Sequence, residues 1–305
     1  MLLVDGRRNR EMNYTYVLHE EKEPYIELTG CLHAERVLRL PGCVDGVPVQ
    51  MIAPHAFERL PDVEEIILPG TILAVGAFAF YGCRSLRKLT MSDLIDGWGF
   101  GAIRFCDEMS ELVIRMKRKR LTVLRDLLGD VDYAFRVILE YDDHTEGYYF
   151  PKYTRGFDED TFARAIHTFT EGSGWAFRET VLRGGVDARE YEKLFIRATY
   201  DGIQTGAEIA LMRLMYPESL SERATEQYRN YLTENAAEIL PWLARKGERE
   251  RCMFMLSEGL AGPGDVSRAV PIAVELHDPE LVATLMEYGR GAKSVEPDTF
   301  DLDDL

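Results

Sequence analysis

The chain has 305 residues, of which 46% are hydrophobic and 29% charged, so it is long enough for two folded units and too apolar for global disorder. Its 52 acidic and 36 basic side chains give a formal net charge of −16 at pH 7. This charge argues against nucleic acid and anionic membrane surfaces as main partners, because both attract basic proteins.

Residues 14–48 predict the first coil of a repeat structure. The stretches TYVLHE and YIELTG alternate apolar and polar residues as strands do. Asp45-Gly46 is typical of a turn before a return segment at 47–52. The step from Leu40-Pro41 to Leu68-Pro69 is longer than the steps that follow, as is usual for a repeat that caps an open end.

Residues 49–114 repeat with a period of about 23 residues, in windows that begin at Val49, Ile72 and Ile95. The positions that align under this step are almost all apolar: Ile52, Val75 and Trp98; Ala56, Ala79 and Ala102; Phe57, Phe80 and Ile103; Leu60, Cys83 and Cys106. Such a period predicts a solenoid whose coils bury their faces against one another.

These residues resemble the BspA-type leucine-rich repeat family, whose repeat reads roughly I-G-x-x-A-F-x-x-C-x-x-L-x-x-I-x-I-P. The matching pieces include Ala56-Phe57 with Leu68-Pro69, Val75-Gly76 with Ala79-Phe80, Cys83 and Leu86, and Gly99 with Ala102 and Cys106. The resemblance covers about residues 25–114. It implies a curved parallel-sheet solenoid used for binding, in a family whose members are often exported to the cell surface.

The leucine-rich end of each coil is the expected strand, and parallel stacking would place like-numbered side chains about 4.8 Å apart. Six side chains between the core positions are the candidate partner-binding residues: Glu65, Lys88 and Glu111 on one ladder, and Ile67, Thr90 and Val113 on another. They are interpreted either as a binding surface or as compatible neighbours that stabilise the strand register.

After the repeat, the basic cluster 115–120 precedes leucines at helical spacing, which favours a capping helix, although contact with phosphate is an alternative. Residues 133–141, YAFRVILEY, predict a strand that closes the far edge of the solenoid. The polar segment 142–147 is the predicted boundary, so the first domain is placed at 1–142.

Residues 148–295 are predicted to form an all-helical domain. One helix is expected to begin at Asp160 and to end at Gly172-Ser173-Gly174. A second, fainter repeat aligns 240–259 with 270–289 and resembles degenerate ankyrin-type helix pairs, although the ankyrin T-P-L-H motif is absent. Residues 296–305 form an acidic tail, interpreted as a solubilising segment or a docking peptide.

The sequence contains no pattern that predicts catalytic, cofactor-binding or metal-binding residues. Its six histidines fall in no metal-ligand spacing, and no P-loop, HExxH motif, nucleophile elbow or Rossmann fingerprint occurs. The five cysteines are dispersed, which favours core thiols over disulfides. The N-terminus lacks a signal-like apolar stretch, so the expected location is the cytoplasm.

The predicted fold class is therefore α/β plus α: a short leucine-rich solenoid followed by an α-helical repeat domain. The predicted function is a non-enzymatic interaction module that binds an unknown protein or peptide through the sheet, the helical groove or both. One alternative is a surface or secreted adhesin. Another is a small-molecule-binding or enzymatic helical domain with a pocket lined by Tyr149, Phe150, His167 or Trp175.

Overall fold

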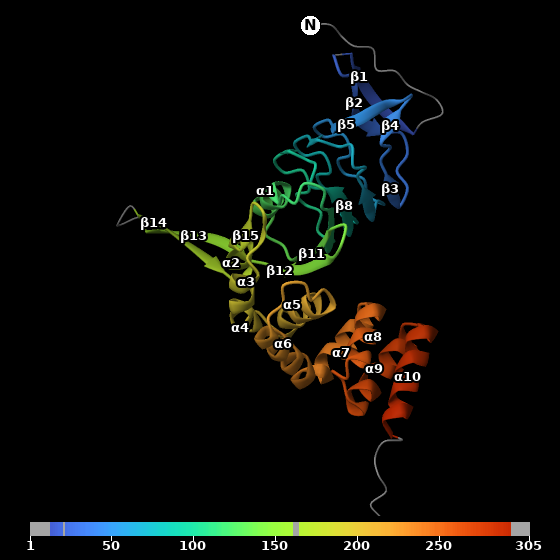
Figure 1. Cartoon of the computed structure of the whole chain (residues 1–305), viewed down its shortest axis with the longest axis vertical. Helices are drawn as coiled ribbons and strands as arrows, with labels where there is room; N and C mark the ends of the chain where they lie inside the picture. Colours follow the sequence, from blue (N-terminus) through green and yellow to red (C-terminus); the bar gives the residue numbers. More distant parts are fainter. Residues whose placement is uncertain (1–12, 21, 161–164, 294–305) are drawn as a thin grey trace, which may run out of the picture. The chain divides into compact units, whose positions relative to one another are not determined.

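The computed structural model describes residues 13–20, 22–160 and 165–293 (Figure 1). The chain forms two compact units. The first comprises Met1–Ala198 with Tyr216–Ser219, and the second comprises Thr199–Met215 with Leu220–Leu305. The predicted boundary at 142–147 is wrong, because this segment covers the turn of a hairpin and the start of its second strand, inside the first unit. The predicted acidic tail lies outside the described residues.

The first unit contains the predicted solenoid, in which successive coils pair at the positions that the repeat aligns. One of its sheets has six strands in the order β12-β11-β10-β8-β6-β3. In this sheet, β3, β6, β8, β10 and β11 run parallel to one another. Strand β12 is antiparallel to β11. The strand bounds are β3 Val37–Arg39, β6 Glu65–Ile67, β8 Lys88–Ser92, β10 Glu111–Arg115, β11 Phe135–Glu140 and β12 Thr145–Phe150.

A second sheet runs along the other side of the coils, in the order β1-β2-β5-β7-β9, with β4 paired to β5. The N-terminal hairpin β1–β2 and the return segment β5 confirm the strands predicted for the entry coil. The strand bounds are β1 Tyr14–His19, β2 Tyr25–Cys31, β4 Cys43–Val44, β5 Val47–Ile52, β7 Ala74–Val75 and β9 Gly97–Trp98.

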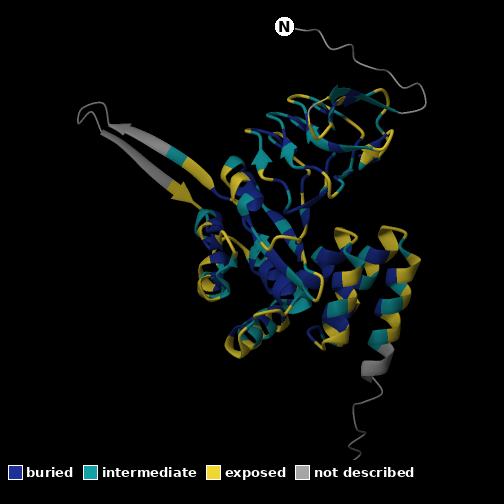
Figure 2. Cartoon of the chain, turned by 45° about the horizontal axis from the view of Figure 1, so that its top comes forward, coloured by how far each residue is buried: buried dark blue, intermediate teal, exposed yellow. Residues whose placement is uncertain are grey.

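Apolar side chains stack in the solenoid core at the same position of successive coils. One row consists of Leu38, Ile66, Leu89, Leu112 and Val137, all nearly or fully buried (Figure 2). A Cβ atom built at Gly99 would lie 2.3 Å from the backbone nitrogen of Ala77, so only glycine allows the coils to approach this closely. The step of the repeat therefore fixes both the row of core residues and the coil spacing.

A helix and a strand pair follow the last repeat. Helix α1 (Thr122–Asp130) buries Val123, Leu124, Leu127 and Leu128, as the leucine spacing predicts. The predicted strand over 133–141 is confirmed as β11, but β12 pairs with it and forms the edge of the sheet instead. The edge position was missed because β12 was assigned to a helical domain.

Strand β13 (Thr154–Asp160) pairs antiparallel with β14 (Ala165–Glu171), so the helix predicted from Asp160 is wrong. The segment AIHTFTE is rich in β-branched and aromatic residues, whose strand preference outweighed the helical spacing of its apolar positions. The Gly172-Ser173-Gly174 stretch passes close to the backbone of Pro151. A Cβ atom at Gly174 would lie 2.1 Å from the Pro151 oxygen.

The remaining elements of the first unit are short. They are α2 (Gly174–Glu179), the two-residue strands β15 (Val181–Leu182) and β16 (Gly185–Val186), and α3 (Ala188–Lys193). Helix α4 (Phe195–Thr199) then leads into the second unit. The start predicted for the all-helical domain, at position 148, is therefore too early, because the helical unit begins at Thr199.

The second unit is helical in its described part, with α5 (Ile203–Met215), α6 (Glu222–Glu234), α7 (Ala236–Arg245), α8 (Arg249–Ser257), α9 (Pro263–Glu275) and α10 (Pro279–Lys293). Helices α7–α8 and α9–α10 are the two helix pairs that the second repeat predicts. Helix α7 packs on α9, and α9 packs on α10. Buried residues lie on the inner sides of these helices (Figure 2).

Candidate functional site

The six predicted partner-binding residues lie on β6, β8 and β10 in the register that the sequence predicts. Glu65 pairs with Lys88, and Lys88 with Glu111. Ile67, Thr90 and Val113 align in the same way. Lys88 Nζ lies 2.7 Å from Glu111 Oε1. Burial alone would lower the pKa of Lys88, but the hydrogen bond and charge of Glu111 outweigh it and raise the pKa.

Part of this face is not available to a partner. Thr90 and Val113 are each only 4% exposed. Glu65, Ile67, Lys88 and Glu111 are half-buried. The structure therefore brings the six residues together but leaves only four of them accessible, and two of those four are engaged with each other as an ion pair.

The basic cluster 115–120 is engaged with acidic groups rather than open to a ligand. The buried carboxylate of Asp93 accepts hydrogen bonds from the backbone nitrogens of Lys117 and Arg118, both at 2.7 Å, and of Arg120 at 3.2 Å. The side chains of Lys117 and Arg118 form ion pairs with Asp142 and Asp96, respectively. The cluster thus holds the turn between β10 and α1 in place.

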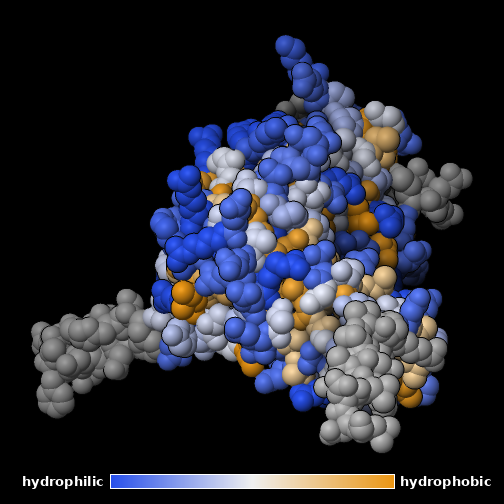
Figure 3. All heavy atoms as spheres, turned by 60° about the horizontal axis from the view of Figure 1, so that its bottom comes forward, coloured by the Kyte–Doolittle hydropathy of each residue, from blue (hydrophilic) through white to orange (hydrophobic). Residues whose placement is uncertain are grey.

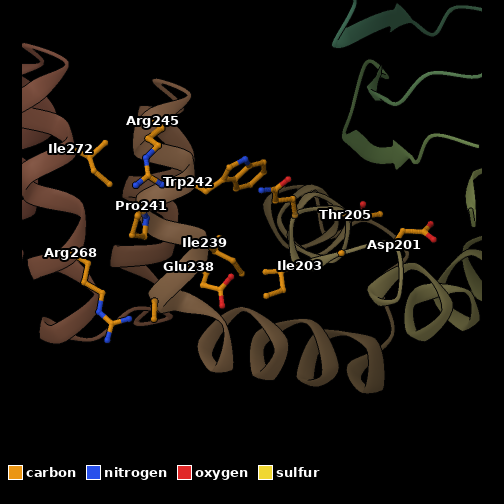
Figure 4. Close-up of a pocket in the computed structure, with 13 residues that line it drawn as sticks. Asp201, Ile203, Thr205, Glu238, Ile239, Pro241, Trp242, Arg245, Arg268 and Ile272 are labelled. Carbon is orange, nitrogen blue, oxygen red and sulfur yellow. The ribbon is translucent and has the colours of Figure 1, made fainter.

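The second unit contains a cavity of about 660 Å³ (Figure 4). Its walls come from three places: the start of α5, one face of α7, and α9. The apolar part includes Ile203, Ile239, Pro241, Trp242 and Ile272, and the charged part consists of Asp201, Glu238, Arg245 and Arg268. The formal charges of these side chains cancel, so the cavity is neutral as well as partly apolar.

The helix repeat explains how this groove is built. Trp242 and Ile272 occupy equivalent positions of the two helix pairs, as do Glu238 and Arg268. Figure 4 shows Trp242 projecting from α7 on the side of α5, and Arg268 and Ile272 projecting from α9. Trp242 is half-buried, and Lys246 Nζ lies 4.9 Å from the centroid of its ring.

A buried ion pair ties α5 to α8 in the same unit. Arg251 Nη1 lies 2.5 Å from Glu208 Oε2, and both side chains are almost fully buried. The second Nη atom of Arg251 lies 2.9 Å from the Met212 sulfur. A movement of α5 away from α8 would separate the two charges in a medium that solvates them poorly. The ion pair therefore fixes the position of α5 relative to α8.

Tyr149 and Phe150, two residues named for the other predicted ligand pocket, do not line the cavity that Trp175 lines. Phe150 is fully buried in the sheet core, and the backbone of Tyr149 exchanges hydrogen bonds with the Tyr191 hydroxyl. Trp175 lines a cavity to which neither residue contributes. The backbone of His167 pairs with Asp158 in the β13–β14 hairpin, and its side chain lies outside the described part.

Buried thiols occupy the repeat core. Cys83 and Cys106 are fully buried and donate to the carbonyl oxygens of Phe57 and Phe80 at 3.2 and 3.3 Å. Burial raises the pKa of Cys83 to about 11 and that of Cys106 to about 12. In residues 13–20, 22–160 and 165–293, no group of three or more His, Cys, Asp or Glu side chains is arranged to hold a metal ion.

None of the helices in the described ranges has the length and apolarity needed to cross a membrane. On the face drawn in Figure 3, hydrophobic residues form small separate patches between hydrophilic ones.

Sequence reasoning named a helical groove but none of its residues. The signal that could have found them was the repeat itself, because equivalent positions of stacked helix pairs line the same face. The offset that aligns 240–259 with 270–289, applied to Trp242, would have selected Ile272. The contribution of α5 had no such signal, since this helix lies outside the repeat.

No protein-family model matches the chain, and no curated protein sequence matches it. The solved structures that it resembles are bacterial leucine-rich repeat proteins. A leucine-rich cell surface protein from Faecalibacterium prausnitzii is 23% identical with a TM-score of 0.30, and the match covers 34% of this chain and 31% of that one. A leucine-rich repeat protein from Bacteroides capillosus is 20% identical with a TM-score of 0.25, covering 35% of this chain and 84% of that one. The leucine-rich repeat protein of T. pallidum is 19% identical with a TM-score of 0.25, covering 36% and 71%.

Proposed function

We propose that this chain is a non-enzymatic interaction module that binds a peptide segment of a partner protein in the groove of its helical unit. The observation that carries the proposal is the cavity of about 660 Å³ with the half-buried Trp242 in its wall. Stacked helix repeats commonly bind through such concave surfaces, and tryptophan is enriched among residues that dominate binding energy.

The lining of the groove suits a peptide of mixed character. Trp242 and Ile272, both half-buried, provide apolar surface for one or two side chains of the ligand. Glu238 and Arg268, at equivalent repeat positions, provide one acceptor and one donor group at the rim. A peptide can use both kinds of contact at once, since its backbone carries donors and acceptors along with its side chains.

The test is selection of binding peptides from a random displayed library, followed by calorimetric titration of the enriched sequences. We expect Trp242→Ala to weaken binding by about 2 kcal/mol or more, the usual threshold for a dominant contact. The matched control is Met253→Ala, which removes a large exposed hydrophobic side chain from the second unit outside the groove. Peptides that bind both variants as well as the original chain would refute the groove as the site.

The sheet face is a second candidate site for the same function, because Glu65, Ile67 and Lys88 are partly accessible on adjacent strands. Lys88→Gln separates the two sites. Loss of peptide binding in this variant with retention in Trp242→Ala would transfer the proposal to the sheet.

A further inference from the structure

A second cavity, of about 360 Å³, lies in the first unit between α1, α2 and β15. Three arginines line it: Arg125 from α1, Arg178 from α2, and Arg183 from the turn after β15. Glu179 is the acidic residue of the lining, so the formal charge of the wall is positive. This is unusual in a chain with 52 acidic and 36 basic side chains.

Arg178 is a buried cation held by carbonyl oxygens. Arg178 is only 7% exposed. Nη1 donates to the oxygens of Pro151 at 2.6 Å and Gly174 at 3.0 Å, and Nη2 donates to the oxygen of Tyr133 at 2.7 Å. Its Nε is buried without a hydrogen-bond partner. Burial lowers the pKa of this guanidinium to about 10, so the group still carries its charge at pH 7.

The three arginines differ from other basic residues of this unit in forming no ion pair with a carboxylate of the described residues. Arg104 pairs with Asp130 at 3.0 Å, and Arg118 pairs with Asp96 at 2.7 Å. Within the described ranges, no carboxylate forms a salt bridge with Arg125, Arg178 or Arg183. Arg178 also lies over the Tyr153 ring and feels the charge of Asp132, but Asp132 forms no ion pair with it and does not line the cavity. The lining keeps a net positive charge, which favours an external anion.

The rest of the wall is apolar or aromatic. Leu128, Val181 and Leu182 line the cavity together with Trp175. The guanidinium of Arg155 stacks on the Trp175 ring, with its Cζ 4.1 Å from the ring centroid. Arg155 itself lines a different cavity. The apolar part of the wall lowers the local dielectric, which strengthens attraction for an anion.

We propose that this cavity is a binding site for a small phosphate-type oxyanion, either inorganic phosphate or the phosphate group of a small organic phosphate. Arginine presents a planar fork of donors that matches phosphate oxygens. The exposed Arg125 and Arg183 contact the oxyanion directly, and the buried Arg178 contributes positive potential from below. The apolar wall around Trp175 accommodates the organic part of an organic phosphate.

The test is calorimetric titration of the full chain with inorganic phosphate and with phenyl phosphate, at matched ionic strength in a chloride buffer, with acetate as the comparison anion. We expect saturable phosphate binding with a dissociation constant below about 10 mM and at least about tenfold weaker binding of acetate. Tighter binding of phenyl phosphate than of inorganic phosphate would identify an organic phosphate as the ligand, and the reverse order would identify phosphate itself.

Two matched variants locate the site. Arg125→Gln with Arg183→Gln removes two exposed charges from the cavity and leaves the carbonyl contacts of Arg178 in place. Arg84→Gln with Arg87→Gln removes the same charge from exposed positions elsewhere in the solenoid. We expect the first pair to weaken phosphate binding by about tenfold or more and the second to leave it unchanged. Absence of saturable binding to the original chain, equal binding of acetate, or equal loss in both pairs would overturn the proposal.

Discussion

Replacing Leu89 by alanine tests the packing that organises the solenoid. Leu89 is fully buried in β8, between Ile66 of β6 and Leu112 of β10. The substitution removes three carbon atoms, and at about 0.8 kcal/mol for each buried methylene the transfer contribution is about 2.4 kcal/mol. The cavity that remains adds to this value, because neighbouring coils are fixed by the same core row and collapse only in part. We expect a total loss of about 3 to 4 kcal/mol.

The comparison variant is Lys88→Gln, one residue earlier on the same strand. It removes the ion pair between Lys88 and Glu111. The Lys88 side chain is 41% exposed and the Glu111 side chain 24% exposed. Solvent screens a pair of this kind, so we expect a loss of about 1 kcal/mol or less.

Both variants are measured by urea unfolding followed by circular dichroism, at one pH and one salt concentration. The unfolding midpoint should fall clearly for Leu89→Ala and little for Lys88→Gln. Equal losses of stability in the two variants would refute the assignment of Leu89 to the inner face of β8 and Lys88 to the outer face. A shift of one residue exchanges the two faces of a strand.

Three further outcomes follow from buried polar groups. Asp93→Ala should lower the free energy of unfolding by about 2 to 4 kcal/mol, since it leaves three backbone donors without their acceptor, and urea unfolding measures the loss. Glu208→Ala should cost about 3 kcal/mol, because it removes the closer of the two carboxylates that pair with the buried Arg251 and leaves only Glu248 at 3.7 Å. The double variant Glu208→Ala with Arg251→Met should recover part of this loss in the same assay. The raised pKa values of Cys83 and Cys106, about 11 and 12 against 9.0 in an unfolded chain, mean that the folded state keeps protons that the unfolded state releases. These thiols should therefore leave the free energy of unfolding constant below pH 9 and lower it between pH 9 and 11, by about 1.4 kcal/mol per pH unit for each thiol. Cys106→Val should remove one of these two contributions. An unchanged dependence of stability on pH in that variant would contradict the raised pKa of Cys106.

The solenoid could be predicted in detail because its signal is repeated. Each coil supplies an independent example of the same local environment. An error in assigning the elements of one coil is therefore corrected by the others. The pairing of Glu65 with Lys88 and of Lys88 with Glu111 followed from the step of the repeat alone. The accessibility of these positions did not follow, since the burial of Thr90 and Val113 depends on what covers the face.

The region between the solenoid and the helix pairs was predicted incorrectly because it is not repeated. Residues 165–171 satisfy both a helical spacing and a strand composition, and the pairing with residues 154–160 decided between them. The same holds for residues 142–147, which have the composition of a linker but form a hairpin turn and the start of β12. A local pattern does not report its partner, so such segments stay ambiguous until the contact is known.

The sequence by itself determined the coil period, the core rows of the solenoid and the two helix pairs, because a hydrophobic period specifies which face of each element is buried. Only the tertiary structure decided where functional side chains meet. The groove joins Ile203 to Trp242 and Ile272, and the second cavity joins Arg125 to Arg178 and Arg183. The helix repeat relates Trp242 to Ile272, but Ile203 and the three arginines lie on elements that share no period. Their proximity is set by the packing of whole helices and strands, which no local stretch of sequence encodes.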